Sequence, residues 1–408
     1  SKPNSRTDLL RAMRLMLPLA FVAAGTSSAA YIDCERAEYV ASDLALQETC
    51  KLLLRNYEKF DVIYGPRHFD NHLSYFVIAL YRMGASAQRI REAYAYETQN
   101  LEPAIPSQHL VNASSWQAYM RQGKYYKDYF EFIDREVHSH GLRTMMRVYA
   151  PVALQGLTGG LLHPLIQLGY GFELMDTNAI SQGVAWLFSH GEIFPKLNPR
   201  PAYSFKDAET ILGSMRADAR LPNRSITLEA LQSEYAEVLS DYDIALPEGD
   251  TIVQVPVLFE ALAARIFGTT CNNFFLLHLC TGSRAMSRIM LHVEDPLVRS
   301  AALQQLWKGF VYVYALEGRP MIGPPRVGPL RPWEHLVKAA LPIQDVHLQK
   351  MVYLCRENYR LDRDTLWWSV AEGVVTLFEN GGSWVFSSFT PAEALWPPDA
   401  SARALLVG

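Results

Sequence analysis

The apolar residues of this chain recur every three or four positions over most of its length. This spacing places apolar side chains on one face of a helix, whereas a half-buried strand alternates at every second position. The pattern is clear in segments 43–56, 71–83 and 86–98, and Gly84 is a typical residue to end the second of them. No series of alternating runs bounded by tight-turn residues occurs. The sequence therefore predicts an all-α protein.

The same period continues through the rest of the chain. It predicts two helices between 206 and 241, a long helical region over 255–292 interrupted near Gly268, and helices over 114–123, 125–138, 142–162, 179–189, 299–317, 333–341, 343–358 and 364–378. No Ser/Gly-rich or highly charged linker divides these segments. We therefore expect one compact multi-helix bundle over 43–408 with a metal site in its interior, preceded by an extension over 1–42.

Composition narrows the classes of function. The 408 residues are 49% hydrophobic and 20% charged, and the formal net charge is −4, so the chain has ample material for a large core. Lys and Arg are slightly outnumbered by Asp and Glu, and no basic run is interleaved with aromatic residues. A nucleic-acid partner is therefore not expected. No stretch reaches the roughly 20 apolar residues that a membrane-spanning helix needs.

The five cysteines are odd in number, widely spaced and free of any Cys-x-x-Cys pair. This argues against a disulfide framework or a zinc ribbon and favours a reducing compartment such as the cytoplasm. Residues 11–30 point the other way, because basic residues, an apolar run and small residues follow one another as in a secretory signal. Pro18 within the run also fits a short packed helix, so a secretory route remains the alternative.

A histidine and a lysine lie three residues apart in the predicted helix 343–358. His347 and Lys350 share a helical face with Met351 and Leu354, so both side chains are expected to point into the interior. Burying an ammonium group is costly, so such a lysine pairs, shifts its pKa or reacts. The alternatives are a lysine that extends to the surface, a salt-bridge partner, and an amine converted to a carbamate by carbon dioxide.

Three more histidines lie at apolar positions. His72 is in the first turn of a predicted helix, His278 lies between aromatic and small residues, and His163 precedes Pro164, which predicts a break between helices. A lone core histidine usually bonds to a carbonyl or carboxylate, but neutral imidazole is also the commonest metal ligand. Four such positions and a buried lysine together indicate a metal centre supplied by distant helices.

Other motifs are rejected. His190-Gly-Glu192 and His292-Val-Glu294 match part of an iron-binding pattern that sits on a strand, and no suitable sheet is predicted. His138-Ser-His140 suggests an amidohydrolase pair, but that chemistry usually sits on a barrel, so a solvated helix end fits better. Gly-x-Gly-x-x-Gly and the P-loop, Gly-x-Ser-x-Gly and His-Glu-x-x-His motifs are absent. A Rossmann-type nicotinamide or flavin site is therefore not expected.

Four separated motifs resemble those of the questin oxidase-like family, in the same order and over about residues 43–360. They are Asn71-His-Leu-Ser74 with 79–86, and the segments 159–173, 274–281 and 345–350. The resemblance implies a mostly helical oxygenase of polyketide secondary metabolism, of the kind that opens an anthraquinone ring in a formal Baeyer–Villiger oxidation. It also implies an aromatic polyketide and dioxygen as partners, with NADPH as a candidate external reductant of the substrate.

The resemblance further implies non-haem iron, Fe(2+), held by histidines and a carboxylated lysine. These catalytic and metal-binding roles fall on His72, His163, His278, His347 and Lys350. An aromatic wall for the substrate is expected from Tyr75, Phe76, Tyr170 and Phe275. The chain departs from the family at Gln167 and Tyr75, where relatives often carry histidine, and we expect these changes to affect the substrate pocket. Two other functions stay open, namely a zinc-dependent hydrolase with the same ligands and a non-catalytic polyketide carrier.

Overall fold

The computed structural model describes residues 34, 43–66, 68–194, 204–247, 249–323 and 329–386. Within these residues the fold is helical, and one two-stranded antiparallel sheet, β1 Ile63–Tyr64 with β2 Phe69–Asp70, is the sole sheet. The α-helices are α2 Leu44–Lys59, α3 Leu73–Arg82, α4 Ala87–Glu97, α5 Tyr126–His140, α6 Leu142–Ala153, α7 His163–Leu174, α8 Thr177–His190, α9 Ala208–Ala217, α10 Leu228–Gln232, α11 Ala236–Ser240, α12 Val255–Phe267, α13 Phe274–Ile289, α14 Pro296–Leu316, α15 Trp333–Ala340, α16 Val346–Asp362 and α17 Thr365–Glu379. The predicted all-α fold is confirmed.

Short 3-10 helices join several of these elements. They are η2 Trp116–Tyr119, η3 Gly123–Tyr125, η4 Leu154–Gly156, η5 Gly159–Leu162, η6 Phe205–Asp207 and η7 Gly249–Gln254. The helix predicted over 142–162 is therefore too long, since α6 ends at Ala153 after Pro151 and gives way to η4 and η5. Between 206 and 241 the structure has three α-helices instead of the two predicted.

Polar caps set the starts of many helices. The side chains of Asp43, Ser86, Asp176 and Thr227 each accept a backbone N–H from the first turn of α2, α4, α8 and α10 respectively. Such caps satisfy N–H groups that have no partner inside the helix. These helix starts agree with the sequence pattern because the signal is local.

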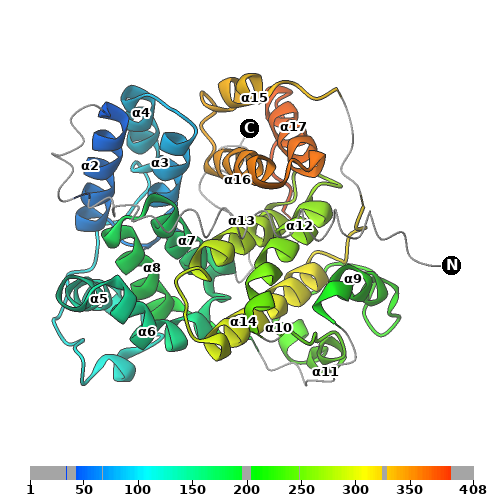
Figure 1. Ribbon diagram of the computed structural model, residues 1–408, viewed down its shortest axis with the longest axis horizontal. Coiled ribbons are helices and arrows are strands. Elements are labelled where there is room, and N and C mark those ends of the chain that lie inside the picture. Colours follow the sequence, from blue (N-terminus) through cyan, green and yellow to red (C-terminus); the bar gives the residue numbers. More distant parts are fainter. Residues whose placement is uncertain are drawn as a thin grey trace.

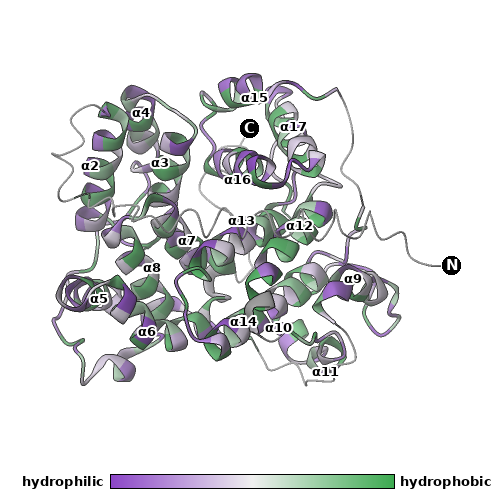
Figure 2. Ribbon diagram, viewed as in Figure 1, coloured by the Kyte–Doolittle hydropathy of each residue, from purple (hydrophilic) through white to green (hydrophobic). Residues whose placement is uncertain are grey.

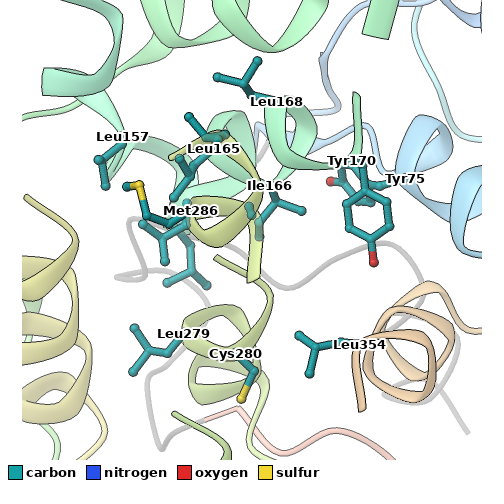
Figure 3. Packing of buried hydrophobic residues seen from close by; sticks show 14 of the residues in the cluster. Tyr75, Leu157, Leu165, Ile166, Leu168, Tyr170, Leu279, Cys280, Met286 and Leu354 are labelled. Carbon is teal, nitrogen blue, oxygen red and sulfur yellow. The ribbon is translucent and has the colours of Figure 1, made fainter. Parts of the chain in front are cut away.

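Helices α7 and α13 cross the middle of the molecule and pack against each other (Figure 1). Around them lie α2 to α4, then α5, α6 and α8, and at the other side α12, α16 and α17 (Figure 1). The central helices are mostly apolar, and purple hydrophilic positions gather on the outer helices (Figure 2). Leu165 and Ile166 of α7 pack near Leu279 and Met286 of α13 in this core (Figure 3).

The close approach of α7 to α13 depends on Gly169. A Cβ atom at this position would overlap the Cα and Cβ atoms of Ala285. Two small residues facing each other thus bring the helix backbones together, and they fix how far one central helix is shifted along the other.

The cysteines differ from the expectation. Cys34 and Cys50 form a disulfide, with Cα atoms 4.8 Å apart, and Cys280 and Cys355 are unpaired buried thiols. The sequence gives no spacing signal for this pair, which forms because Cys34 lies against the first half of α2. The disulfide removes the cysteine-based argument for a reducing compartment.

None of the described helices is long and apolar enough to cross a bilayer. The signal-like segment 11–30 and most of the expected extension 1–42 lie outside the described residues, as does the tail from 387 onward.

Candidate metal centre

Four histidine side chains meet in the interior. One ring nitrogen from each of His72, His163, His278 and His347 lies within 4.8 Å of the others, and all four residues are buried. They come from the start of α3, the first residue of α7, the second turn of α13 and the first turn of α16. The structure thus brings together the four histidines that the sequence singled out.

The β1–β2 hairpin positions His72. Asn71, next to it, accepts a hydrogen bond from the Leu73 backbone N–H at 3.0 Å and so fixes the start of α3. The Nδ1–H of His72 donates to the backbone carbonyl oxygen of Asp70 at 2.6 Å. This bond aims Nε2 of His72 at the other histidines.

A left-handed loop positions His163. Gly160, Leu161 and Leu162 have φ values of 50°, 51° and 71°, and the two leucines adopt a conformation that L-residues rarely take. His163 itself is helical, so the break predicted at the residue before Pro164 lies in the three residues that precede it. Nδ1 of His163 contacts the carbonyl oxygen of Gly160 and lies 3.0 Å from Oδ2 of Asp70.

Capped helix starts position the other two histidines. Asn273 caps α13 by accepting from the Leu276 N–H, and one turn later Nδ1–H of His278 donates to the Phe274 carbonyl oxygen at 2.8 Å. Asp345 caps α16 two residues before His347. The indole N–H of Trp384 donates to both carboxylate oxygens of Asp345, which holds this cap in place.

The Nε2 atoms approach one another closely. The separation is 2.9 Å between His72 and His163, 3.1 Å between His72 and His347, and 3.2 Å between His163 and His278. In His72 and His278 the Nδ1 atom faces a carbonyl oxygen, which can only accept, so Nδ1 carries the proton. Each neutral ring then presents an Nε2 lone pair to the cluster.

Electrostatics keep these rings neutral. Burial is the main cause that holds the pKa of His72, His278 and His347 well below the ordinary value. The charge of Lys350 and the neighbouring imidazoles lower the same pKa values further. Neutral imidazoles whose lone pairs face each other repel, and a cation between them removes that repulsion.

The spacing fits a transition-metal ion. With metal–nitrogen bonds of about 2.1 Å, two ligands at a right angle have nitrogens about 3.0 Å apart. The three observed Nε2 separations lie close to that value. The residues present therefore suit a buried metal bound by imidazole nitrogens.

Lys350 belongs to the same site. It is fully buried on the inner face of α16, one turn after His347, as the helical spacing predicts. Its Nζ atom lies 4.8 Å from the centre of the Tyr75 ring, and the Tyr75 ring lies 5.2 Å from that of His72. A reactive or charged nitrogen at this place acts directly on the histidines.

Two residues of the expected aromatic wall lie near the histidine cluster. Tyr75 and Tyr170 pack against each other with ring centres 5.8 Å apart (Figure 3), and the centre of the Tyr75 ring lies 6.3 Å from that of His163. Phe76 and Phe275 are buried, but the ring that touches both His278 and His347, at 5.0 and 4.8 Å, belongs to Phe274. Phe274 lies four residues before His278, so the helical period already placed it on the same face.

The rejected histidines lie outside the cluster. His292 stacks on Phe172 with ring centres 4.1 Å apart, and the His138 and His140 side chains pair with carboxylates of their own helix, α5. His190 is half-buried beside Gly123, and its partial burial lowers its pKa to about 4. These contacts are structural, as expected from the sequence.

A family model described as Questin oxidase-like matches residues 69–355. The chain belongs to the questin oxidase-like family. The matched region begins at β2 and ends within α16, so it contains His72, His163, His278, His347 and Lys350.

Named relatives agree with this family. The chain is 25% identical to oxidoreductase AflY of Aspergillus parasiticus, over 75% of this chain and 72% of the relative. It is 24% identical to the Baeyer–Villiger monooxygenase dmxR6 of a Cryptosporiopsis species, over 45% and 42% of the two chains. It is 22% identical to questin oxidase of Aspergillus terreus, over 36% and 35%. For the last two relatives the similarity spans less than half of either chain.

Proposed function

We propose that this protein is a non-haem iron oxygenase that opens a ring of an anthraquinone or related aromatic polyketide, in a formal Baeyer–Villiger oxidation of secondary metabolism. The observation that carries the proposal is the convergence of four imidazoles beside a buried lysine. Membership of the questin oxidase-like family, with relatives named as oxidases and monooxygenases, supplies the reaction class.

The proposed ligands are His72, His163, His278 and His347, which would hold Fe(2+) through Nε2. When bound, the metal would supply the activation of dioxygen. In His72 and His278 the Nδ1–H group is hydrogen-bonded to a carbonyl oxygen, and Nε2 points into the cluster. Metal binding would therefore require little rearrangement of these two rings. This preorganisation favours the metal because the cost of orienting the ligands is met during folding.

Lys350 is proposed to provide an oxygen ligand as a carbamate. The neutral amine attacks carbon dioxide, a C–N bond forms, and the nitrogen releases one proton, which leaves a carboxylate on the side chain. Complete burial favours the neutral amine that this reaction needs. The product would add a negative charge beside the four imidazoles, where a cation is to be held.

The aromatic residues are proposed to orient the substrate. The rings of Tyr75 and Phe274 meet the histidines edge-on and Tyr170 packs on Tyr75, so a flat polyketide would be oriented by these three rings. Burial of the surrounding helices would keep water from the reacting atoms. Since the chain has no nicotinamide-binding motif, a reductant such as NADPH would act on the substrate elsewhere.

Elemental analysis of the purified protein tests the proposal, combined with dioxygen uptake in the presence of a reduced anthraquinone. Iron with substrate-dependent uptake is the expected result. Zinc with hydrolysis would favour a hydrolase, and a metal-free protein that still binds polyketide would favour a carrier.

A matched pair of variants sharpens this test. His278→Ala should lose at least nine-tenths of the bound iron and all turnover, because a central ligand is gone. His292 lies just beyond the end of the same helix and stacks on Phe172. The variant His292→Ala should therefore retain both the bound iron and the turnover. Full iron and activity in His278→Ala would refute the proposed ligand set.

A further inference from the structure

We propose that Asp70 is the positioning residue of this metal centre, orienting two of its four histidines from outside the ligand set. The inference rests on the proposed function where it concerns metal affinity. The orientation of the imidazoles, by contrast, concerns the chain alone and can be measured without metal.

Asp70 reaches two ligands that are far apart in the sequence. Its backbone carbonyl oxygen accepts the Nδ1–H of His72 at 2.6 Å, and its carboxyl Oδ2 lies 3.0 Å from Nδ1 of His163. His72 and His163 are 91 residues apart, and their Nε2 atoms approach to 2.9 Å. One residue therefore fixes the rotation of two neighbouring rings.

The β1–β2 hairpin explains how Asp70 is held. Asp70 is the last residue of β2 and pairs with Ile63 of β1, in the single sheet of the described residues. The side chain of Asp70 is 13% exposed, so its contact with His163 is largely shielded from water. In a strand the backbone carbonyl lies in the plane of the sheet and the side chain projects out of it, so each group of Asp70 meets a different histidine.

The left-handed loop before α7 is shaped to receive this carboxyl group. A Cβ atom at Gly160 would lie 3.3 Å from Oδ1 of Asp70, and the φ of Gly160 is +50°. Glycine thus allows the loop to approach the carboxyl group, and the same loop directs its own Gly160 carbonyl at His163. The hairpin and the loop act on one imidazole together.

A carboxylate behind a histidine has a defined chemical effect. It keeps the proton on Nδ1, presents the Nε2 lone pair, and raises the basicity of the ring toward a metal. Loss of such a partner typically weakens metal binding by about 10-fold to 100-fold.

The test compares Asp70→Asn with Glu192→Gln. The first change keeps the shape of Asp70 but removes its charge, and the second removes a carboxyl group, that of Glu192, which lies within reach of the Asp70 charge. Affinity for Co(II) is measured by competition with a chelator, together with the visible spectrum of the bound ion. Histidine tautomers are read in the metal-free proteins by nitrogen NMR.

We expect Asp70→Asn to bind Co(II) about 10-fold to 100-fold more weakly, with a changed spectrum and a shifted Nδ1 resonance of His163, because the charged partner of its Nδ1–H is gone while the Gly160 carbonyl oxygen stays. Glu192→Gln should match the unaltered protein in all three measurements. Unchanged affinity, spectrum and Nδ1 resonance in Asp70→Asn would overturn the inference. If the unaltered protein bound neither cobalt nor iron, the proposed function would fail instead, and the nitrogen resonances of the metal-free proteins would decide the role of Asp70 alone.

Discussion

At the scale of single residues, the centre combines groups that are costly to bury with contacts that fix their orientation. His278 is fully buried, yet its Nδ1–H is satisfied by the carbonyl oxygen one turn earlier, and its remaining lone pair faces other lone pairs. Such an arrangement lowers the stability of the metal-free protein, and this stability is recovered when a cation binds. Lys350, buried beside the same rings, is the residue whose chemical state matters most.

Replacing Lys350 tests that state. Lys350→Ala should lose most of the bound metal, because the proposed carbamate oxygen is gone, and it should leave a space beside Tyr75. A small carboxylate such as formate can enter that space, so we expect added formate to restore part of the metal content. Metal content by elemental analysis, with and without formate, is the measurement.

Lys308 provides the control, since it is a buried lysine of α14 outside the histidine cluster. Lys308→Ala should keep its metal, and formate should have no effect on it. Normal metal content in Lys350→Ala without any carboxylate would refute the carbamate role.

At the scale of elements, the loop of η5 departs most from regular structure. Three consecutive residues are left-handed, and two of them are leucines, each of which costs about 1–2 kcal/mol in this conformation. Their burial against the central helices offsets that cost: a Cβ atom on Gly282 of α13 would overlap Leu162. The strain is placed immediately before His163, where it sets the direction of a proposed ligand.

Gly160→Ala should therefore destabilise the protein by about 1–2 kcal/mol, because alanine is unfavourable at φ +50° and its Cβ crowds Oδ1 of Asp70. Gly213→Ala is the opposite control. Gly213 lies inside α9 with open space around it, so alanine should stabilise the protein by up to about 1 kcal/mol. Urea unfolding of both variants measures the difference, and equal shifts would contradict the role assigned to Gly160.

Helices and loops differ in how far sequence determines them. The starts of α2, α4 and α8 follow from capping residues and apolar period, which are local signals. The left-handed run at 160–162 was not predictable, since leucine normally avoids it and only tertiary packing supports it. Asp70 was missed for a similar reason, because it ends a two-residue strand that has no sequence signal and gains its role only when α7 is placed beside it.

At the scale of the whole molecule, the sequence identified the four histidines but not their contacts. Shared apolar faces are local, whereas the meeting of α3, α7, α13 and α16 depends on packing between distant segments. The cysteine spacing argued against a disulfide framework, yet Cys34 and Cys50 form a disulfide, and Phe274, which contacts His347, was not among the expected wall residues. Three of the four helices that carry the clustered histidines, α7, α13 and α16, are also joined by an ionic cluster one to three turns beyond those histidines.

Glu173 of α7 is the centre of this cluster. Its carboxylate accepts from Arg284 of α13 at 2.8 Å and from the hydroxyl of Tyr353 of α16 at 2.9 Å, and Arg288 lies 3.2 Å away. Burial by itself would raise the pKa of Glu173, but the two arginines and the Tyr353 bond outweigh it and lower the pKa to about 2. The three helices are thereby held in one register.

Glu173→Gln should destabilise the protein at neutral pH by about 3 kcal/mol, because Arg284 loses its buried counter-charge. The folded pKa of Glu173 is below its ordinary value, so the unfolded chain takes up this proton first as pH falls. The contribution of Glu173 is thus complete above about pH 4.5 and declines toward pH 2. The difference in free energy of unfolding between the unaltered protein and Glu173→Gln should narrow over that interval.

Denaturant unfolding at several pH values measures this difference. The control is Glu294→Gln, which breaks the exposed pair with Arg143 and should show little effect. A gap that stayed constant down to pH 2 would mean that the charge of Glu173 does not hold α7, α13 and α16 together.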